Sequence, residues 1–163
     1  MPHSSLAIAN VFIGRALDSG GRGLTQMQVQ KLVYLGHGWS LAALDEPLID
    51  DAVEAWQFGP VIRNIYSALS RYGNQSVERL IRWGEDTVLI DSDDDGIASE
   101  DIPEWEMSII DIVWEIYGTY PAFKLSALTH QPDTPWSQTY RAGAKRVIPN
   151  GLIQAHFKEL LAA

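Results

Sequence analysis

Apolar side chains recur every three or four positions through most of the chain, which is the pattern of helices that bury one face. The best-defined helix starts at Thr25, which suits an N-cap, and Gln28 completes a capping box three residues later. Apolar spacing extends this helix to about Ala43. The same pattern, bounded by Gly, Pro and capping residues, predicts further helices over 4–17, 61–72, 77–83, 104–118, 122–130 and 134–140, and a last one capped by Asn150.

Two short segments differ from this pattern. Side chains alternate over residues 53–58, which predicts an extended piece, and the apolar run over residues 87–90 predicts a strand. Gly59 permits a sharp change of direction, and Pro60 suits the first position of the helix over 61–72. The sequence therefore predicts a mainly α fold: a single compact helical domain over residues 1–163 with a small β element, either a short strand pair or an extended arm.

The helix over 25–43 is predicted to bury one row of side chains, whereas Lys31 lies on a different face and is interpreted as a solvated charge. Gly36 and Gly38 each lower helix propensity by about 1 kcal/mol relative to Ala, so we expect close packing against another backbone there. His37 lies between them and is interpreted as a hydrogen-bonded structural histidine, with a functional imidazole as the alternative. Two other helices are predicted to bury large apolar rows, namely Trp105, Ile109, Ile112, Val113 and Ile116, and Ile153, Phe157, Leu160 and Leu161.

The composition is that of a globular protein, because 163 residues with 46% apolar content suffice for one domain with its own core. The absence of cysteine excludes disulfides, thiolate catalysis and cysteine-ligated zinc. The apolar run over residues 6–13 is interrupted by Asn10 and is too short to span a membrane. We therefore expect a cytoplasmic protein with no membrane partner.

The net charge of −9 is concentrated in one segment. Residues 83–123 contain twelve acidic residues and no Lys or Arg, whereas residues 124–163 contain five basic and two acidic residues. Such a negative field repels phosphate backbones and attracts basic proteins, so the sequence favours a basic protein partner over nucleic acid. A simpler interpretation, in which the acids only keep the domain soluble, stays open.

The acidic loop over residues 91–101 contains the best match to a metal site. Asp91, Asp93 and Asp95 alternate before Gly96 as in the opening of a calcium loop, but Ile102 stands where a closing Glu is needed. The four histidines have no metal-ligand spacing, and no pattern singles out catalytic residues, a metal site or a cofactor. A cation-regulated interaction module and an enzyme with a dispersed site are the alternatives to a binding protein.

A set of spaced motifs over residues 24–136 carries a family resemblance. The first motif contains Lys31, Tyr34 and Trp39, and the second contains Glu54, Trp56, Gly59, Pro60 and Tyr66. The third contains Thr129, His130, Pro135 and Trp136. In this order and spacing they resemble the Panacea domain family, which includes SocA-type antitoxins and phage-associated proteins of the GepA type. The acidic loop matches no family motif and is interpreted as a variable insertion.

The resemblance implies a non-enzymatic antitoxin that neutralises a cognate toxin by direct contact. In one mode known for the family, the antitoxin is an adaptor that presents the toxin to an ATP-dependent protease. The resemblance does not locate the interface, so the chemistry of the side chains has to suggest it. Asp93, Asp94 and Asp95 are expected to steer a basic toxin, and Trp56 and Phe58 are candidates for an aromatic anchor. For Trp56 the favoured interpretation is packing in the core.

Overall fold

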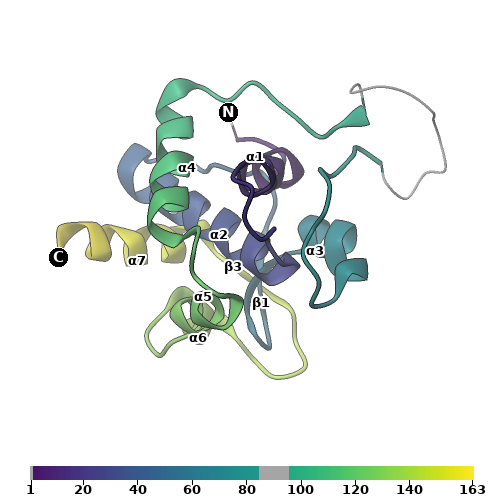
Figure 1. The fold of residues 1–163 in the computed structure, drawn as a ribbon. Helices are drawn as coiled ribbons and strands as arrows, with labels where there is room; N and C mark the ends of the chain where they lie inside the picture. The colour runs from purple at the N-terminus through teal and green to yellow at the C-terminus, as the bar shows by residue number, and fades with distance from the viewer. Residues whose placement is uncertain (1, 85–95) are drawn as a thin grey trace.

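The computed structural model describes residues 2–84 and 96–163, and within them the fold is mainly helical with one small sheet. This confirms the predicted fold class; the strand expected over residues 87–90 lies outside the described residues. The elements are α1 (Ser5–Asp18), α2 (Gln26–Leu44), β1 (Val53–Trp56), β2 (Gly59–Ile62), α3 (Arg63–Leu69), the 3₁₀ helix η1 (Ser70–Tyr72), α4 (Glu104–Tyr117), α5 (Ala122–Thr129), α6 (Pro135–Thr139), β3 (Arg146–Ile148) and α7 (Asn150–Ala162) (Figure 1).

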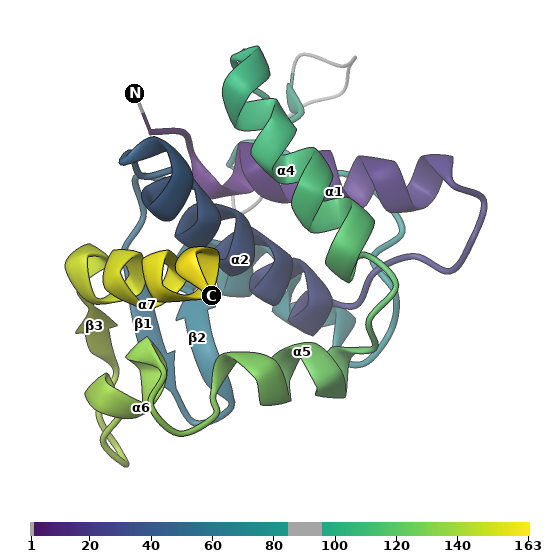
Figure 2. The ribbon, with the colours of Figure 1, turned by 90° about the vertical axis from the view of Figure 1, so that its left-hand side faces the viewer.

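Helix α2 runs through the middle of the molecule and contacts α1, α4, α5, α7 and β2 (Figure 2). It begins as predicted, because the Thr25 side chain accepts from the Gln28 backbone N–H and the Gln28 side chain accepts from the Thr25 N–H. Gly38 permits the closest approach of α7, since a Cβ there would lie 2.3 Å from a ring carbon of Phe157. The glycine thus admits an aromatic ring, where the sequence had suggested a second backbone.

His37 has the structural role that the sequence favoured. The ring is buried, its Nδ1 accepts from the N–H groups of Leu48 and Ile49, and its Nε2 lies 2.9 Å from the Asn150 Oδ1. This network requires the neutral tautomer with the proton on Nε2. Burial also lowers the pKa of His37.

The three strands form an antiparallel sheet in the order β2-β1-β3, with Trp56 opposite Gly59 and Val53 opposite Ile148. The prediction that Pro60 opens a helix is wrong, because Pro60 lies in β2 and α3 begins at Arg63. Side chains of α2 explain the strand: Gln30 bonds both the N–H and the C=O of Ile62 at 2.9 Å, and Lys31 donates to the Pro60 carbonyl at 2.8 Å. The outward backbone groups of this edge strand are therefore satisfied, and Pro60 has no N–H to leave unpaired.

Residues 77–83 were predicted to be helical and are not. Their backbone groups bond distant parts of the chain, because the Val77 N–H donates to Leu24 and the Ile81 N–H donates to the Asn10 side chain. Asn10 also donates to the carbonyls of Ile81 and Ala98. Tertiary hydrogen bonds thus replace those that a helix would supply.

Two helices bury fewer of the expected side chains. In α4 the buried residues are Glu106, Ile110 and Val113, whereas the predicted Trp105 is mostly exposed. Glu106 is drawn inward because its carboxylate pairs with the buried His3 ring. In α7, Ile153 and Phe157 are buried as predicted, but Leu160 and Leu161 are exposed and Asn150 is the first helical residue, not the cap.

Candidate functional site

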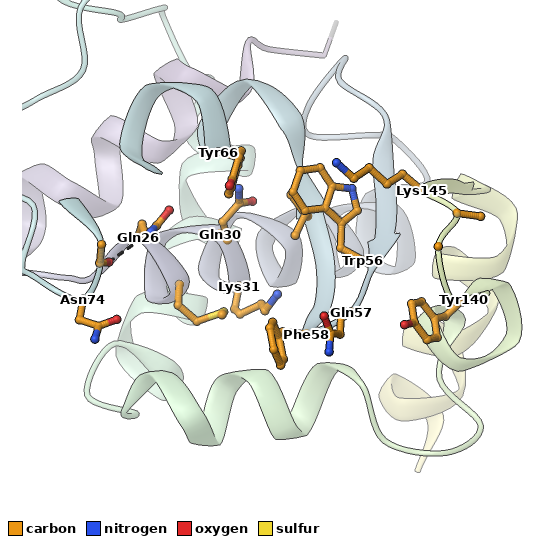
Figure 3. Close-up of a pocket in the computed structure, with 15 residues that line it drawn as sticks. Gln26, Gln30, Lys31, Trp56, Gln57, Phe58, Tyr66, Asn74, Tyr140 and Lys145 are labelled. Atoms are coloured by element: carbon orange, nitrogen blue, oxygen red, sulfur yellow. Dashed lines mark hydrogen bonds between the residues drawn. The ribbon is translucent and has the colours of Figure 1, made fainter. Parts of the chain in front are cut away.

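A groove of about 530 Å³ lies beside the tip of the β1–β2 hairpin. The hairpin tip, residues 56–59, forms one wall, the start of α2 forms another, and the segment 140–145 closes the end (Figure 3). The lining is mainly aromatic, aliphatic and amide-bearing, and consists of Gln26, Met27, Gln30, Lys31, Trp56, Gln57, Phe58, Val61, Tyr66, Gly73, Asn74, Tyr140, Gly143, Ala144 and Lys145.

The hairpin tip presents an aromatic side chain to solvent from a fixed backbone. Phe58 is 62% exposed, while its carbonyl accepts a 2.9 Å hydrogen bond from the Ser126 hydroxyl on α5. Gly59 has a φ of +118°, and a Cβ there would lie 3.0 Å from the Lys31 Nζ. Only glycine suits both the dihedral and the space. The tip is therefore held from below by α2 and α5 while Phe58 projects outward.

Lys31 is fully buried in the floor of the groove, so its interpretation as a solvated charge is wrong. The face of α2 that carries it is covered by β2 and α5, which the helical pattern alone does not reveal. Its Nζ donates to the Pro60 carbonyl, and no carboxylate is paired with it among the described residues. Loss of water around the ammonium lowers the pKa of Lys31 to about 7.

Trp56 is half-buried and forms the wall of the groove next to this lysine. Its ring packs edge-on against Tyr66 at 4.9 Å between centroids, and the Lys145 Nζ lies 4.2 Å from the ring centre. Its indole N–H lies 3.3 Å from a carboxylate oxygen of Glu54. Trp56 is therefore partly a packing residue, as the sequence favoured, and partly a surface of the groove.

The Glu54 carboxylate is fixed from the other side by Arg63. The two side chains form a two-pronged pair, with N–O distances of 3.0 and 2.7 Å. This guanidinium holds the pKa of Glu54 below its usual range. The pair joins the start of α3 to β1 and so positions Tyr66 against Trp56.

The third motif locks the hairpin from α5 and α6. The Trp136 indole N–H donates to the Trp56 carbonyl, and Pro135 occupies the first turn of α6. Thr129 on α5 is buried with its hydroxyl facing Gly59. The His130 ring lies 5.3 Å from the Trp136 ring.

His130 is also adjacent to Ser126, with 3.3 Å between Nδ1 and Oγ. The Ser126 proton is directed at the Phe58 carbonyl, so this pair braces the tip and does not prepare a nucleophile.

Two residues of the first motif are core residues away from the groove. Tyr34 and Trp39 both contact the Phe157 ring edge-on, at 5.9 and 5.1 Å. Burial raises the pKa of Tyr34 well above its ordinary value. Their role is to dock α7 onto α2.

The groove differs in charge from the rest of the chain. Its lining includes Lys31 and Lys145 but no Asp or Glu, although the protein has a net charge of −9. Sequence reasoning gave no site role to Gln30, Tyr140 or Lys145, because none belongs to a periodic pattern that points to the hairpin. Asp93, Asp94 and Asp95 lie outside the described residues, so their role in steering stays a prediction.

The described residues hold no group of three or more His, Asp or Glu side chains placed to bind a metal ion. Over the same ranges, 2–84 and 96–163, no helix combines the length and apolar character that crossing a bilayer requires.

Known proteins similar to this chain share the region that contains these motifs. The family model described as "Antitoxin SocA-like, Panacea domain" matches residues 29–137. Antitoxin SocA of Caulobacter vibrioides (strain NA1000 / CB15N) is 30% identical over 137 residues, which cover 80% of this chain. The chain spans 66% of that relative's length, slightly less than two thirds. No solved structure matches the chain. The match over residues 29–137 includes most of α2, the whole hairpin and the whole third motif, and the chain belongs to the SocA-like Panacea domain family.

Proposed function

We propose that this protein is an antitoxin that neutralises a cognate toxin by binding it directly, and that the hairpin tip and its groove form the binding site. Three motifs far apart in the sequence meet at the tip, and this convergence carries the proposal. Lys31 lies below the tip, Trp56 and Gly59 form it, and Trp136 bonds its backbone. The family membership supports the antitoxin role, because the similar Caulobacter protein is named as an antitoxin.

Exposed aromatic side chains on a rigid backbone are the usual anchors of protein interfaces. Phe58 has this character, since most of its side chain meets solvent while its own carbonyl is fixed by α5. A rigid anchor loses little conformational entropy when a partner binds. Phe58 is therefore the first residue through which we expect the toxin to be held.

The chemistry of the groove lining also determines which toxin side chains can bind in it. Its walls are aromatic and aliphatic, and its charged side chains are Lys31 and Lys145. Such a lining suits an apolar side chain flanked by carbonyl or carboxylate acceptors, and it disfavours Lys or Arg. A basic toxin would be attracted by the acidic segment over residues 83–123, at a distance from the groove itself.

The proposal is tested with the toxin encoded by the adjacent gene. Co-expression of the native protein is expected to restore growth, and the purified pair is expected to form a complex in calorimetry. Phe58→Asp should weaken binding at least tenfold, because an aromatic anchor is worth about 2 kcal/mol or more. Phe123→Asp is the matched control, since Phe123 is 77% exposed on α5 and lies outside the groove.

Absence of both a complex and growth rescue with the native protein would eliminate the antitoxin function. Equal loss in the Phe58 and Phe123 variants would eliminate the groove as the site. Repeating the rescue in cells that lack an ATP-dependent protease separates the two modes of action. Rescue that persists indicates direct blocking, and rescue that disappears indicates delivery of the toxin for degradation.

A further inference from the structure

The outward face of α4 carries a row of large apolar side chains that nothing in the described structure covers. Trp105, Ile112 and Ile116 are 60%, 51% and 50% exposed. With the half-buried Ile109 they are spaced by four, three and four residues, which is the spacing of a helix–helix seam. A neighbouring face of α4, with Glu106, Ile110 and Val113, is the one that packs on the core.

Helix α4, which carries this row, lies on the other side of α2 from the β1–β2 hairpin (Figure 1 and Figure 2). None of its residues lines the groove. Single exposed apolar residues are common, but a continuous row that includes a tryptophan marks an interaction surface. The row is therefore a second surface, separate from the proposed toxin site.

The charges beside the row select the kind of partner. Glu104, Asp111 and Glu115 follow one edge of it at spacings of seven and four, and α4 contains no Lys or Arg. Arg15 pairs with Asp111, while Glu104 and Glu115 are exposed. If a second copy of α4 packed on this row, two acidic edges would meet and repel each other. A basic partner, in contrast, would be attracted by the carboxylates of Glu104 and Glu115.

We propose that the outward face of α4 docks an amphipathic helix of a basic partner. That helix presents Leu or Ile at seam positions to Trp105, Ile112 and Ile116, and Lys or Arg to Glu104 and Glu115. Docking of this kind buries the exposed apolar row, and the flanking ion pairs fix the orientation.

The probe is a fluorescein-labelled synthetic peptide of Leu–Lys heptads, with Leu at the seam positions, followed by fluorescence anisotropy. We expect saturable binding to the native protein and a loss of at least tenfold in the double variant Ile112→Asp, Ile116→Asp. Both side chains are half exposed, so the variant should keep the native circular dichroism spectrum. The matched control is Leu17→Asp with Val147→Asp, which alters two exposed apolar residues away from α4 and should leave binding unchanged.

The charge requirement is tested separately. Glu104→Lys with Glu115→Lys should weaken binding several-fold at low salt, and a Leu–Glu peptide of the same length should not bind. Equal binding by the native protein and the Ile112, Ile116 double variant overturns the proposal, as does equal binding of the acidic peptide or no binding of the basic one. A native dimer in sedimentation that the double variant dissociates also overturns it, in favour of a second copy. No toxin is used, so these outcomes are independent of the antitoxin function.

Discussion

Replacement of Lys31 by methionine should change how the stability of the protein depends on pH. Burial lowers the pKa of Lys31 from 10.5 to about 7 in the folded protein, whereas the unfolded chain keeps the ordinary value. Between pH 7 and 10.5 the unfolded state therefore binds more protons than the folded state. The free energy of unfolding must rise with pH in this window.

The magnitude follows from the size of the shift. One pKa unit corresponds to about 1.4 kcal/mol, so the Lys31 contribution should rise by about 2 kcal/mol between pH 7 and pH 9. Tyr34 does not interfere, because the ordinary pKa of tyrosine and the raised pKa of Tyr34 in the fold both lie above pH 9. Lys31→Met removes the titrating group while keeping a side chain of similar length.

Urea unfolding of the native protein and of Lys31→Met at pH 7, 8 and 9 provides the measurement. The difference in unfolding free energy, native minus variant, should rise with pH, and other titrating groups cancel in this difference. Lys158→Met is the matched control, since it removes a lysine whose side chain is 48% exposed, and its difference should stay flat. A flat difference for Lys31→Met would refute this reasoning, because it would show that the folded protein keeps the ammonium protonated throughout this range.

Three other changes test the packing around α2. Gly38→Ala should destabilise the fold by about 2 kcal/mol or more in thermal unfolding because its Cβ meets the Phe157 ring, whereas Gly151→Ala, which meets nothing within 4 Å, should not destabilise it. His37→Gln should be less stable than the native protein, and this difference in unfolding free energy should shrink as the pH falls below 6.5. The lowered pKa of His37 makes the native protein lose stability in acid, and the variant has no such group. A difference that grows in acid would contradict a buried neutral ring. Asn10→Leu should cost about 2–4 kcal/mol in urea unfolding because three hydrogen bonds to the backbone of Ile81 and Ala98 are lost, of which the Ile81 carbonyl alone keeps a second partner, the Ala98 N–H. A neutral result would show that the other two groups find water.

Local signals allowed α2 to be predicted well. The Thr25 capping box and the glycines at 36 and 38 depend on neighbouring residues or on one facing element, so their chemistry is legible in sequence. The start of β2 was not predictable in the same way. Pro60 satisfies the rules for a first helical residue, and what decides against a helix is a set of hydrogen bonds from Gln30 and Lys31, about thirty residues earlier.

The face of α4 was assigned wrongly for a related reason. Val113 is buried as predicted and Ile110 is buried without having been predicted, whereas the predicted Trp105, Ile112 and Ile116 are exposed. Periodicity alone does not separate two apolar rows on one helix. The pairing of Glu106 with His3, 103 residues away in the chain, turns the row of Ile110 and Val113 inward. The candidate site was only partly predictable from the sequence. Trp56 and Phe58 stand out as aromatic residues at a turn, but the burial of Lys31 beneath them and the groove beside them depend on tertiary contacts.

The buried Lys31 and Gln30 also explain why the hairpin tip has one defined position. Both side chains bond the outward backbone groups of β2. Lys31 donates to the Pro60 carbonyl, and Gln30 donates to the Ile62 carbonyl and accepts from the Ile62 N–H. If β2 slipped by one residue, its side chains would exchange faces, so that the buried Ile62 would take the place of the partly exposed Val61. A methionine at position 31 would avoid the desolvation of an ammonium but would leave the Pro60 carbonyl without this donor. The bond from Lys31 holds β2 directly beside the tip that carries Trp56 and Phe58, so the lysine stabilises the geometry of the proposed binding site at the expense of the stability of the fold.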